Sequence, residues 1–292
     1  MIGAREIFSQ RDPRIFQILA LSGLLAFGWF ARAFEIAPLQ LACVLAAALA
    51  AQWLGSFMNA MKFEARSALI TALSLTLLLR ADSVWPLMAA AAIAIGSKFM
   101  LRLHGKHIFN PANIGIVAMV LMTDAAWTSP GQWGTAVWLA ALLAGGGCFV
   151  AYRAARLDVP LIFLGAYAGL LLARALWLGD PLAIPLLRLQ NGALILFAFF
   201  MISDPKTTPD GPRARAAFAI ATAGLAYLLQ YHLFMTDGLF YALALMSLVR
   251  PLIELFDRAP SYRWGDAPPK IASFARSRRK RAAKAPRPAP AE

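Results

Sequence analysis

Ten apolar runs, separated by short polar connections, make up most of the chain. A helix that crosses a bilayer needs about 20 consecutive apolar residues, and several of the runs reach or approach that length. We therefore expect membrane helices at Ile15–Phe30, Ile36–Leu54, Ser67–Leu79, Trp85–Ile95, Phe109–Met122, Thr135–Tyr152, Val159–Leu178, Gly192–Ile202, Ala214–Tyr231 and Gly238–Val249.

Composition supports the same class of protein. Hydrophobic residues make up 60% of the chain, charged residues only 15%, and the mean hydropathy is +0.62. These values exclude an ordinary soluble domain and indicate an all-α membrane protein with one bundle of about ten transmembrane helices. The two cysteines, Cys43 and Cys148, lie alone in apolar runs. Their spacing predicts neither a disulfide framework nor a metal centre.

The distribution of basic residues predicts the orientation. The net charge is +13, and the Lys and Arg residues gather in alternate connections and in the tail. Because cytoplasmic loops carry the positive excess, we expect both termini in the cytoplasm and no role for nucleic acid. Residues 1–14 form the N-terminal segment, 15–257 the membrane domain, and 258–292 a basic tail. The tail is too polar to fold alone and would lie near anionic lipid or a partner.

The eighth apolar run, Gly192–Ile202, is too short to cross a bilayer comfortably and ends in Ser-Asp-Pro-Lys-Thr-Thr-Pro. Pro205 removes a backbone donor and moves Asp204 out of helical geometry, so the helix should end near Ser203. Polar, irregular backbone inside a membrane protein is tolerated where it is buried by protein or lines a wet cavity. The alternative is an ordinary cytoplasmic loop that follows a short span.

The third run, Ser67–Leu79, is a counterpart of the eighth. Each of the two is followed by an acid and then a proline, with Asp82 and Pro86 in one case and Asp204 and Pro209 in the other. The two runs lie five spans apart, third and eighth, and an odd number of spans per half inverts the second half. The halves, about 15–125 and about 134–250, would then be inverted repeats with short or interrupted helices 3 and 8. Asp82 would then face the outside and Asp204 the cytoplasm. Paired broken helices in inverted halves indicate a binding site near the midplane.

Two groups of polar side chains are candidates for that site. Asn110 and Asn113 flank Pro111 at a helix start, where free N–H groups and the positive end of the helix dipole favour a phosphate, a carboxylate or the carbonyl edge of a flavin. The simpler interpretation of both asparagines is helix capping. Asp204 contributes a carboxylate on the other side, together with one cation and two hydroxyls from Lys206, Thr207 and Thr208.

Metal binding is not predicted. His104 and His107 lie three residues apart in a basic connection. Two histidines without a third ligand do not make a metal site. We therefore expect no metal at these positions.

Three segments resemble the NqrB/RnfD family, the large membrane subunits of the sodium-pumping quinone reductase and of the Rnf complexes. They are SALITALSLTLLL at 67–79, KHIFNPANIG at 106–115 and FMISDPKTTP at 200–209. The resemblance implies ten spans in two inverted halves, with an architecture related to urea-transporter-like folds. It also implies a flavin-bearing electron-transfer subunit in a bacterial inner membrane, with other subunits as partners and, in some members, coupling to sodium movement.

The resemblance departs from the family in one respect. The family carries FMN on a threonine of an SGAT-like motif after the FNPA span, and residues 123–133 contain no such motif. Thr128 is the nearest candidate acceptor, but the missing motif argues against a covalent link. The alternatives are FMN or riboflavin bound without a covalent link, or no flavin. The chain also lacks the long N-terminal extension of the quinone reductase subunit.

We therefore expect a flavin site with one wall formed by Asn110, Pro111 and Asn113. The other wall would be formed by Asp204, Lys206, Thr207 and Thr208, with Asp82 as the inverted counterpart of Asp204. The same inverted-repeat cavity would also suit a channel or transporter for a small polar solute or ion, which needs no cofactor. A third hypothesis is an assembly scaffold without a working site.

Overall fold

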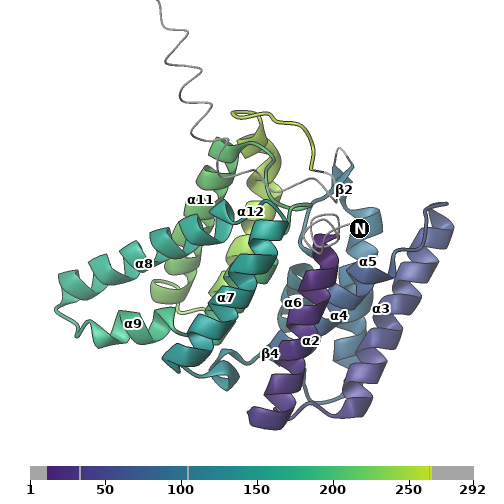
Figure 1. Cartoon of the computed structure of the whole chain (residues 1–292), viewed down its shortest axis with the longest axis horizontal. Coiled ribbons are helices and arrows are strands. Elements are labelled where there is room, and N and C mark those ends of the chain that lie inside the picture. The colour runs from purple at the N-terminus through teal and green to yellow at the C-terminus, as the bar shows by residue number, and fades with distance from the viewer. Residues whose placement is uncertain (1–11, 33, 104, 263, 265–292) are drawn as a thin grey trace, which may run out of the picture.

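The computed structural model describes residues 12–32, 34–103, 105–262 and 264, and this part of the chain is mostly helical (Figure 1). The helices are α2 (Pro13–Ala31), α3 (Pro38–Met58), α4 (Ala65–Leu78), α5 (Val84–Met100), α6 (Pro111–Met122), η1 (Pro130–Trp133), α7 (Val137–Arg153), α8 (Asp158–Leu178), α9 (Ala183–Leu189), α10 (Gly192–Leu196), η2 (Phe197–Met201), α11 (Pro212–Tyr231) and α12 (Gly238–Glu254). The strands are β1 (Leu79–Ala81), β2 (Arg102–Leu103), β3 (Lys106–His107) and β4 (Ala126–Thr128).

The expectation of a helical protein is confirmed, and each of the ten apolar runs lies largely on a helix. Three helices, α2, α3 and α8, are long and apolar enough to cross a membrane. The pair formed by α9 and α10–η2 also meets that criterion as one segment bent by 48°. Helix α9 was not predicted, because its short sequence contains Pro185 and Arg188 and breaks the apolar pattern.

The helices pack in two groups that follow the two halves of the chain (Figure 1). In the first half α5 contacts both α3 and α6, and α2 packs against α4. In the second half α11 contacts both α8 and α12, and α7 packs against α10 and η2. The halves meet where α2 contacts α7 and where α6 contacts α12.

The third run changes conformation at its end. Helix α4 ends at Leu78, and Leu79–Ala81 continues as strand β1, which pairs with β4 in antiparallel register. The last carbonyl groups of α4 then need donors from elsewhere. Arg80 donates to the Thr76 carbonyl at 2.7 Å, and Gln132 Nε2 donates to the Leu77 carbonyl at 2.6 Å. The side chains of the β1–β4 region therefore cap the broken helix.

The eighth run breaks as the sequence predicts. Helix α10 passes into one turn of π-helix, η2, which ends at Met201. The chain then turns, and the Asp204 carbonyl accepts hydrogen bonds from the backbone N–H groups of Thr207 and Thr208 at 3.1 and 3.0 Å. Pro205 lies inside this turn, where its missing N–H costs nothing.

Helix α6 begins deep inside the protein. Lys106, which precedes it, donates to Glu254 at the end of α12 at 3.1 Å. Asn113, in its first turn, donates to the Phe240 carbonyl near the start of α12 at 3.0 Å. Phe240 and Glu254 lie 14 residues apart on one helix, which corresponds to about 21 Å at 1.5 Å per residue. The chain from Lys106 to Asn113 therefore runs along most of the length of α12.

Candidate functional site

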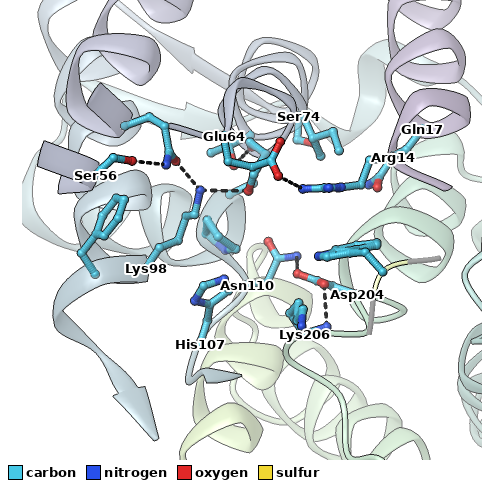
Figure 2. Close-up of a pocket in the computed structure, with 18 of the residues that line it drawn as sticks. Arg14, Gln17, Ser56, Glu64, Ser74, Lys98, His107, Asn110, Asp204 and Lys206 are labelled. Atoms are coloured by element: carbon cyan, nitrogen blue, oxygen red, sulfur yellow. Dashed lines mark hydrogen bonds and ion pairs between the residues drawn. The ribbon is translucent and has the colours of Figure 1, made fainter. Parts of the chain in front are cut away.

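A cavity of about 300 Å³ lies where α2, α4 and α6 begin and where α3 and α5 end (Figure 2). Four of the predicted site residues line it: Asn110, Pro111, Asp204 and Lys206. The other polar and charged lining residues come from the first half and from the connection after α5; they are Arg14, Gln17, Gln52, Ser56, Lys62, Glu64, Ser67, Thr71, Ser74, Lys98, Arg102 and His107. Phe99, Phe200 and Trp264 add aromatic surface.

Asn110 and Asp204 meet at this cavity although 94 residues separate them in the chain. The Asn110 side chain caps α6, since its Oδ1 accepts from the Asn113 backbone N–H at 3.1 Å. Its Nδ2 donates to the Met201 carbonyl at 3.3 Å and faces Asp204 Oδ2 at 3.4 Å. One amide therefore serves the start of α6 and the end of η2 together, and Figure 2 shows it facing Asp204.

Asp204 is held by its own turn. Its Oδ1 accepts the Lys206 backbone N–H at 2.9 Å. Burial raises the pKa of the Asp204 carboxyl, although this N–H group and the charges of Lys206, Lys106 and Lys98 oppose the shift. The Lys206 ammonium lies on the cavity wall and donates to the Tyr262 carbonyl at 3.0 Å.

Three predicted site residues do not line the cavity and instead make hydrogen bonds next to its walls. Thr207 and Thr208 are buried, and both hydroxyls donate to the Asp204 carbonyl, at 3.3 and 3.0 Å. Thr208 Oγ1 also accepts from Arg156 Nε at 3.2 Å. The Asn113 side chain is fully buried and points to α12. These residues shape the turn and the α6–α12 contact.

Asp82 and Thr128 lie elsewhere. The Asp82 backbone N–H donates to the Ala125 carbonyl at 3.1 Å, beyond the β1–β4 pair. The Thr128 hydroxyl donates to Asp237 and lines a separate cavity of about 350 Å³. The structure therefore does not bring Asp82 or Thr128 to the cavity that Asn110 and Asp204 line, although Asp82, like Asp204, follows a helix that breaks off.

Lys98 is the main residue that the sequence pattern did not single out. The apolar run was expected to end at Ile95, but α5 continues to Met100 and carries Lys98 in its last turn. The side chain is only 5% exposed. Its ammonium donates to Gln52 Oε1 at 2.6 Å and to Ser67 Oγ at 2.9 Å. The apolar residues that follow Lys98 were the available signal, because they extend the helical pattern past it.

The start of α2 contributes a cluster of charges. Asp12 caps α2 and pairs with Arg14, which also pairs with Glu64 at 3.1 Å. Hydrogen bonds and charge from Arg14 lower the pKa of Asp12 against the opposing effect of burial. Arg14 in turn lies over the ring of Trp264, with its guanidinium carbon 4.7 Å from the ring centroid.

Trp264 lines the cavity, and Tyr262 packs against it with ring centroids 5.4 Å apart. Tyr262 is 6% exposed, and its backbone N–H donates to Asp210 at 3.2 Å. Arg156 lies 4.9 Å from its ring. The basic tail was expected to begin at residue 258, so these aromatic contacts lie inside its predicted range. Aromatic rings supply apolar area that a charged segment can bury against the protein; residues 265–292 lie outside the described part of the chain.

His107 faces the cavity as a neutral imidazole. Burial lowers its pKa to about 3, and the charges of Lys98, Arg102 and Lys206 contribute to the shift. Its Nδ1 is buried and has no hydrogen-bond partner within the described ranges. Those ranges also contain no group of three His, Cys, Asp or Glu side chains that could hold a metal ion.

The balance of charge in the cavity is positive. Arg14, Lys62, Lys98, Arg102 and Lys206 line it, against two carboxylates, those of Glu64 and Asp204. The N-termini of α4 and α6 add the positive ends of two helix dipoles. The arrangement can bind a flat polar molecule that carries acceptor atoms or negative charge.

The sequence resembles known proteins over its second half. Residues 122–263 match the profile of the NQR2, RnfD, RnfE family. Over 144 residues the chain is 33% identical to the D subunit of the ion-translocating oxidoreductase complex of Escherichia coli O9:H4 (strain HS), and the same values hold for strain K12 and for O157:H7. The match covers 49% of this chain and 38% of each relative, so the chain matches less than half the length of these curated relatives.

Proposed function

We propose that the protein is a membrane subunit of an ion-translocating oxidoreductase complex and that its cavity binds a flavin, since residues 122–263 match the profile of the NQR2, RnfD, RnfE family. The relatives carry the name of such a subunit. By this proposal the protein lies in a bacterial inner membrane, and the other subunits of the complex are its partners. Both termini would face the cytoplasm, as the distribution of basic residues predicts.

The observation that carries the flavin proposal is the meeting of Asn110 and Asp204 at the cavity wall. A helix start and a helix end face each other there, so backbone donors, an amide and a carboxylate lie within reach of one ligand. The volume of about 300 Å³ is at the lower end for ligand sites. It suits a single flavin ring system better than a dinucleotide.

The residues present fit a flavin. Phe99, Phe200 and Trp264 offer apolar surface to a flat ring, and Lys98, Lys206 and His107 offer polar groups to its edge. A bound flavin would supply one- and two-electron redox chemistry that the protein itself lacks. The role of the protein would be to hold the ring, to exclude bulk water and to set the local charge.

The pairing of helices supports an inverted repeat. The contacts of α5 with α3 and α6 correspond to those of α11 with α8 and α12, and α2 on α4 corresponds to α7 on α10 and η2. The two helices that precede a break, α4 and α10–η2, hold equivalent places in this scheme. We propose that the bundle consists of two five-helix halves of opposite orientation, with the broken helices third and eighth.

The test is an absorbance spectrum of the full chain purified in detergent, followed by titration with FMN and with riboflavin. A bound flavin gives the purified protein the visible absorbance bands of a flavin. If acid precipitation of the protein releases this colour into solution, the flavin is not covalently linked. Asp204→Ala should abolish binding, whereas Asp82→Ala, outside the cavity, should not. A folded protein that carries no flavin and binds neither compound contradicts the proposal. Solute uptake into proteoliposomes that depends on Asp204 would support a transporter instead.

A further inference from the structure

A second cavity, of about 510 Å³, lies at the other end of the first half, where α2 and α4 end and α3 begins. Two arginines line this cavity: Arg32 directly follows α2, and Arg80 lies on β1 directly after α4. Among the described residues that line it, Glu35 is the one acid. Two guanidinium groups against one carboxylate leave the cavity with an excess of positive charge.

Neither of these guanidinium groups is paired with a carboxylate. Arg80 is half-buried, and its side chain donates to two backbone carbonyls at 2.7 and 2.9 Å and to Gln132 Oε1 at 2.5 Å, which are all neutral acceptors. Arg32 lies close to Gly134, where an added Cβ would be 2.8 Å from its Nη2. Within the described ranges neither arginine forms an ion pair. A cavity with two unpaired arginines favours a ligand that carries negative charge.

An apolar groove lies beside this cavity on the flank of the protein. Helices α2 and α3 both pack against α4, and a groove of about 480 Å³ lies between them. Its lining is apolar except for one hydroxyl and consists of Ile18, Ser22, Leu25, Ala26, Trp29, Phe30, Leu41, Leu45, Leu69 and Leu73. Ile18 and Trp29 are 11 residues apart on α2, which corresponds to about 16 Å. This length is close to one leaflet of a hydrocarbon core about 30 Å thick.

The groove and the cavity meet end to end. Trp29 in the groove donates through Nε1 to the carbonyl of Ile36, which lines the cavity, at 2.7 Å. Leu73 of the groove lies three residues before Thr76 of the cavity on α4, so both are on one face of that helix. Trp127 lines the cavity and is 45% exposed, and indole rings favour the headgroup layer of a bilayer. A charged cavity at headgroup depth thus continues into an apolar groove about one leaflet long.

We propose that this cavity and groove bind one anionic phospholipid, with its phosphodiester at Arg32 and Arg80 and one acyl chain between α2 and α3. The proposal requires that α2 and α3 cross a membrane, and both are long and apolar enough to do so. It does not depend on a flavin. A headgroup with one negative charge balances the two arginines and Glu35. Ser129, which lines the same cavity, offers a hydroxyl to a headgroup such as that of phosphatidylglycerol.

The experiment titrates the full chain, freed of lipid in dodecyl maltoside, with phosphatidylglycerol or phosphatidylcholine and follows the unfolding temperature. Phosphatidylglycerol should raise this temperature more, because a ligand that binds the folded state stabilises it. Arg32→Gln should weaken phosphatidylglycerol binding about fivefold, the factor for one basic residue near an anionic headgroup, and leave phosphatidylcholine unaffected. Arg188→Gln, at an exposed position on the separate cavity that Thr128 lines, is the matched control and should keep the preference.

The groove is tested by a second pair of variants. Ala26 and Ala46 are both exposed, and only Ala26 lines the groove. Ala26→Phe places a ring where the acyl chain would lie and should weaken the binding of both lipids, whereas Ala46→Phe on α3 should not. Glycerophosphoglycerol, which is the headgroup without acyl chains, should not stabilise the wild type at the same concentration.

The outcomes separate a lipid site from its alternatives. Equal stabilisation by phosphatidylglycerol and phosphatidylcholine, or an unchanged preference in Arg32→Gln, would overturn the anionic headgroup site. Stabilisation by glycerophosphoglycerol or inorganic phosphate equal to that by the lipid would show a site for free anions and also overturn the proposal. A protein that prefers phosphatidylglycerol but binds no flavin would leave this inference standing while the flavin proposal fails.

Discussion

The side-chain amide of Asn110 donates a hydrogen bond to the backbone carbonyl of Met201, 91 residues further along the chain, at a distance of 3.3 Å. The same side chain caps α6 through its oxygen. A single residue of the first half thus caps its own helix at the start and the broken helix of the second half at the end. The sequence motif around Asn110 and the motif around Asp204 are therefore parts of one structure.

Asn110→Ala should destabilise the protein more than the loss of a cap alone. An N-cap is worth about 1 kcal/mol, and a buried carbonyl left without its donor costs about 1–3 kcal/mol more. Asn191 is the matched control, because it caps α10 and, among the described residues, its side-chain oxygen accepts only the Ala193 N–H, at 2.8 Å. Thermal unfolding in detergent should rank wild type above Asn191→Ala and Asn191→Ala above Asn110→Ala. Equal effects of the two substitutions would contradict the double role.

Gly115→Ala should separate α5 from α6. A Cβ at this position would lie 2.6 Å from the Ala90 carbonyl oxygen, which belongs to the backbone and cannot move aside freely. Overpacking of this kind costs about 1–3 kcal/mol. Gly96 lies on α5, and a Cβ added there would meet no atom within 4 Å, so Gly96→Ala should be neutral or stabilise the helix by up to about 1 kcal/mol. Unfolding temperatures of the two variants test this contrast.

Asp12→Asn should destabilise the protein near pH 7 and have little effect at acidic pH. The asparagine still caps α2, but its charge pairing with Arg14 and Arg66 is lost, at a cost of about 1 kcal/mol. The pKa of Asp12 is lowered in the folded state, so its contribution is complete above the unfolded value of about 3.9 and disappears as the pH falls through the folded value. Unfolding temperatures from pH 7 to pH 3 should converge. A constant difference across this range would exclude a charge effect.

Removal of residues 261–292 should open the cavity beside Trp264. Arg14 lies on Trp264 and Arg156 on Tyr262, and each such contact contributes about 0.5–2 kcal/mol. Ser56→Cys, on the cavity wall, would report access in a protein whose Cys43 and Cys148 are replaced by alanine. A hydrophilic maleimide should label it at least about tenfold faster after truncation, which corresponds to about 1.4 kcal/mol.

The control for this experiment is Ser129→Cys, which lines another cavity formed with Arg80 and Trp127. Its labelling rate should not change on truncation. Trp264→Ala in the full chain should produce part of the effect at Ser56→Cys, because it removes one of the two stacking contacts. Unchanged labelling of Ser56→Cys would show that the segment does not limit access to the cavity.

The positions of the helices followed from the sequence because lipid as a solvent requires long apolar runs. The cap at Asn110 and the turn at Asp204 were also predictable, since both depend on neighbours within a few residues. Lys98 was not, because its role depends on Gln52 and Ser67, which lie 46 and 31 residues away. The contact of Trp264 with the cavity was not predicted either, because the sequence around this residue is basic and was interpreted as an unfolded tail. Asp82 shows the limit of the repeat argument: it follows strand β1, whereas Asp204 lies in a turn after η2, and only Asp204 lines the cavity.

The deep start of α6 constrains the order in which the protein can be built. Lys106 donates to the Thr208 carbonyl, to Asp210 and to Glu254, which lie 102, 104 and 148 residues later in the chain. Asn113 donates to the Phe240 carbonyl on α12, 127 residues later. At about 5–20 residues per second, the ribosome needs several seconds to tens of seconds to reach those partners. During that interval Lys106 and Asn113 lack these acceptors, so we expect the insertion machinery or a neighbouring subunit to shelter them. A nascent chain that stops before α12 should therefore be a preferred target for membrane proteases.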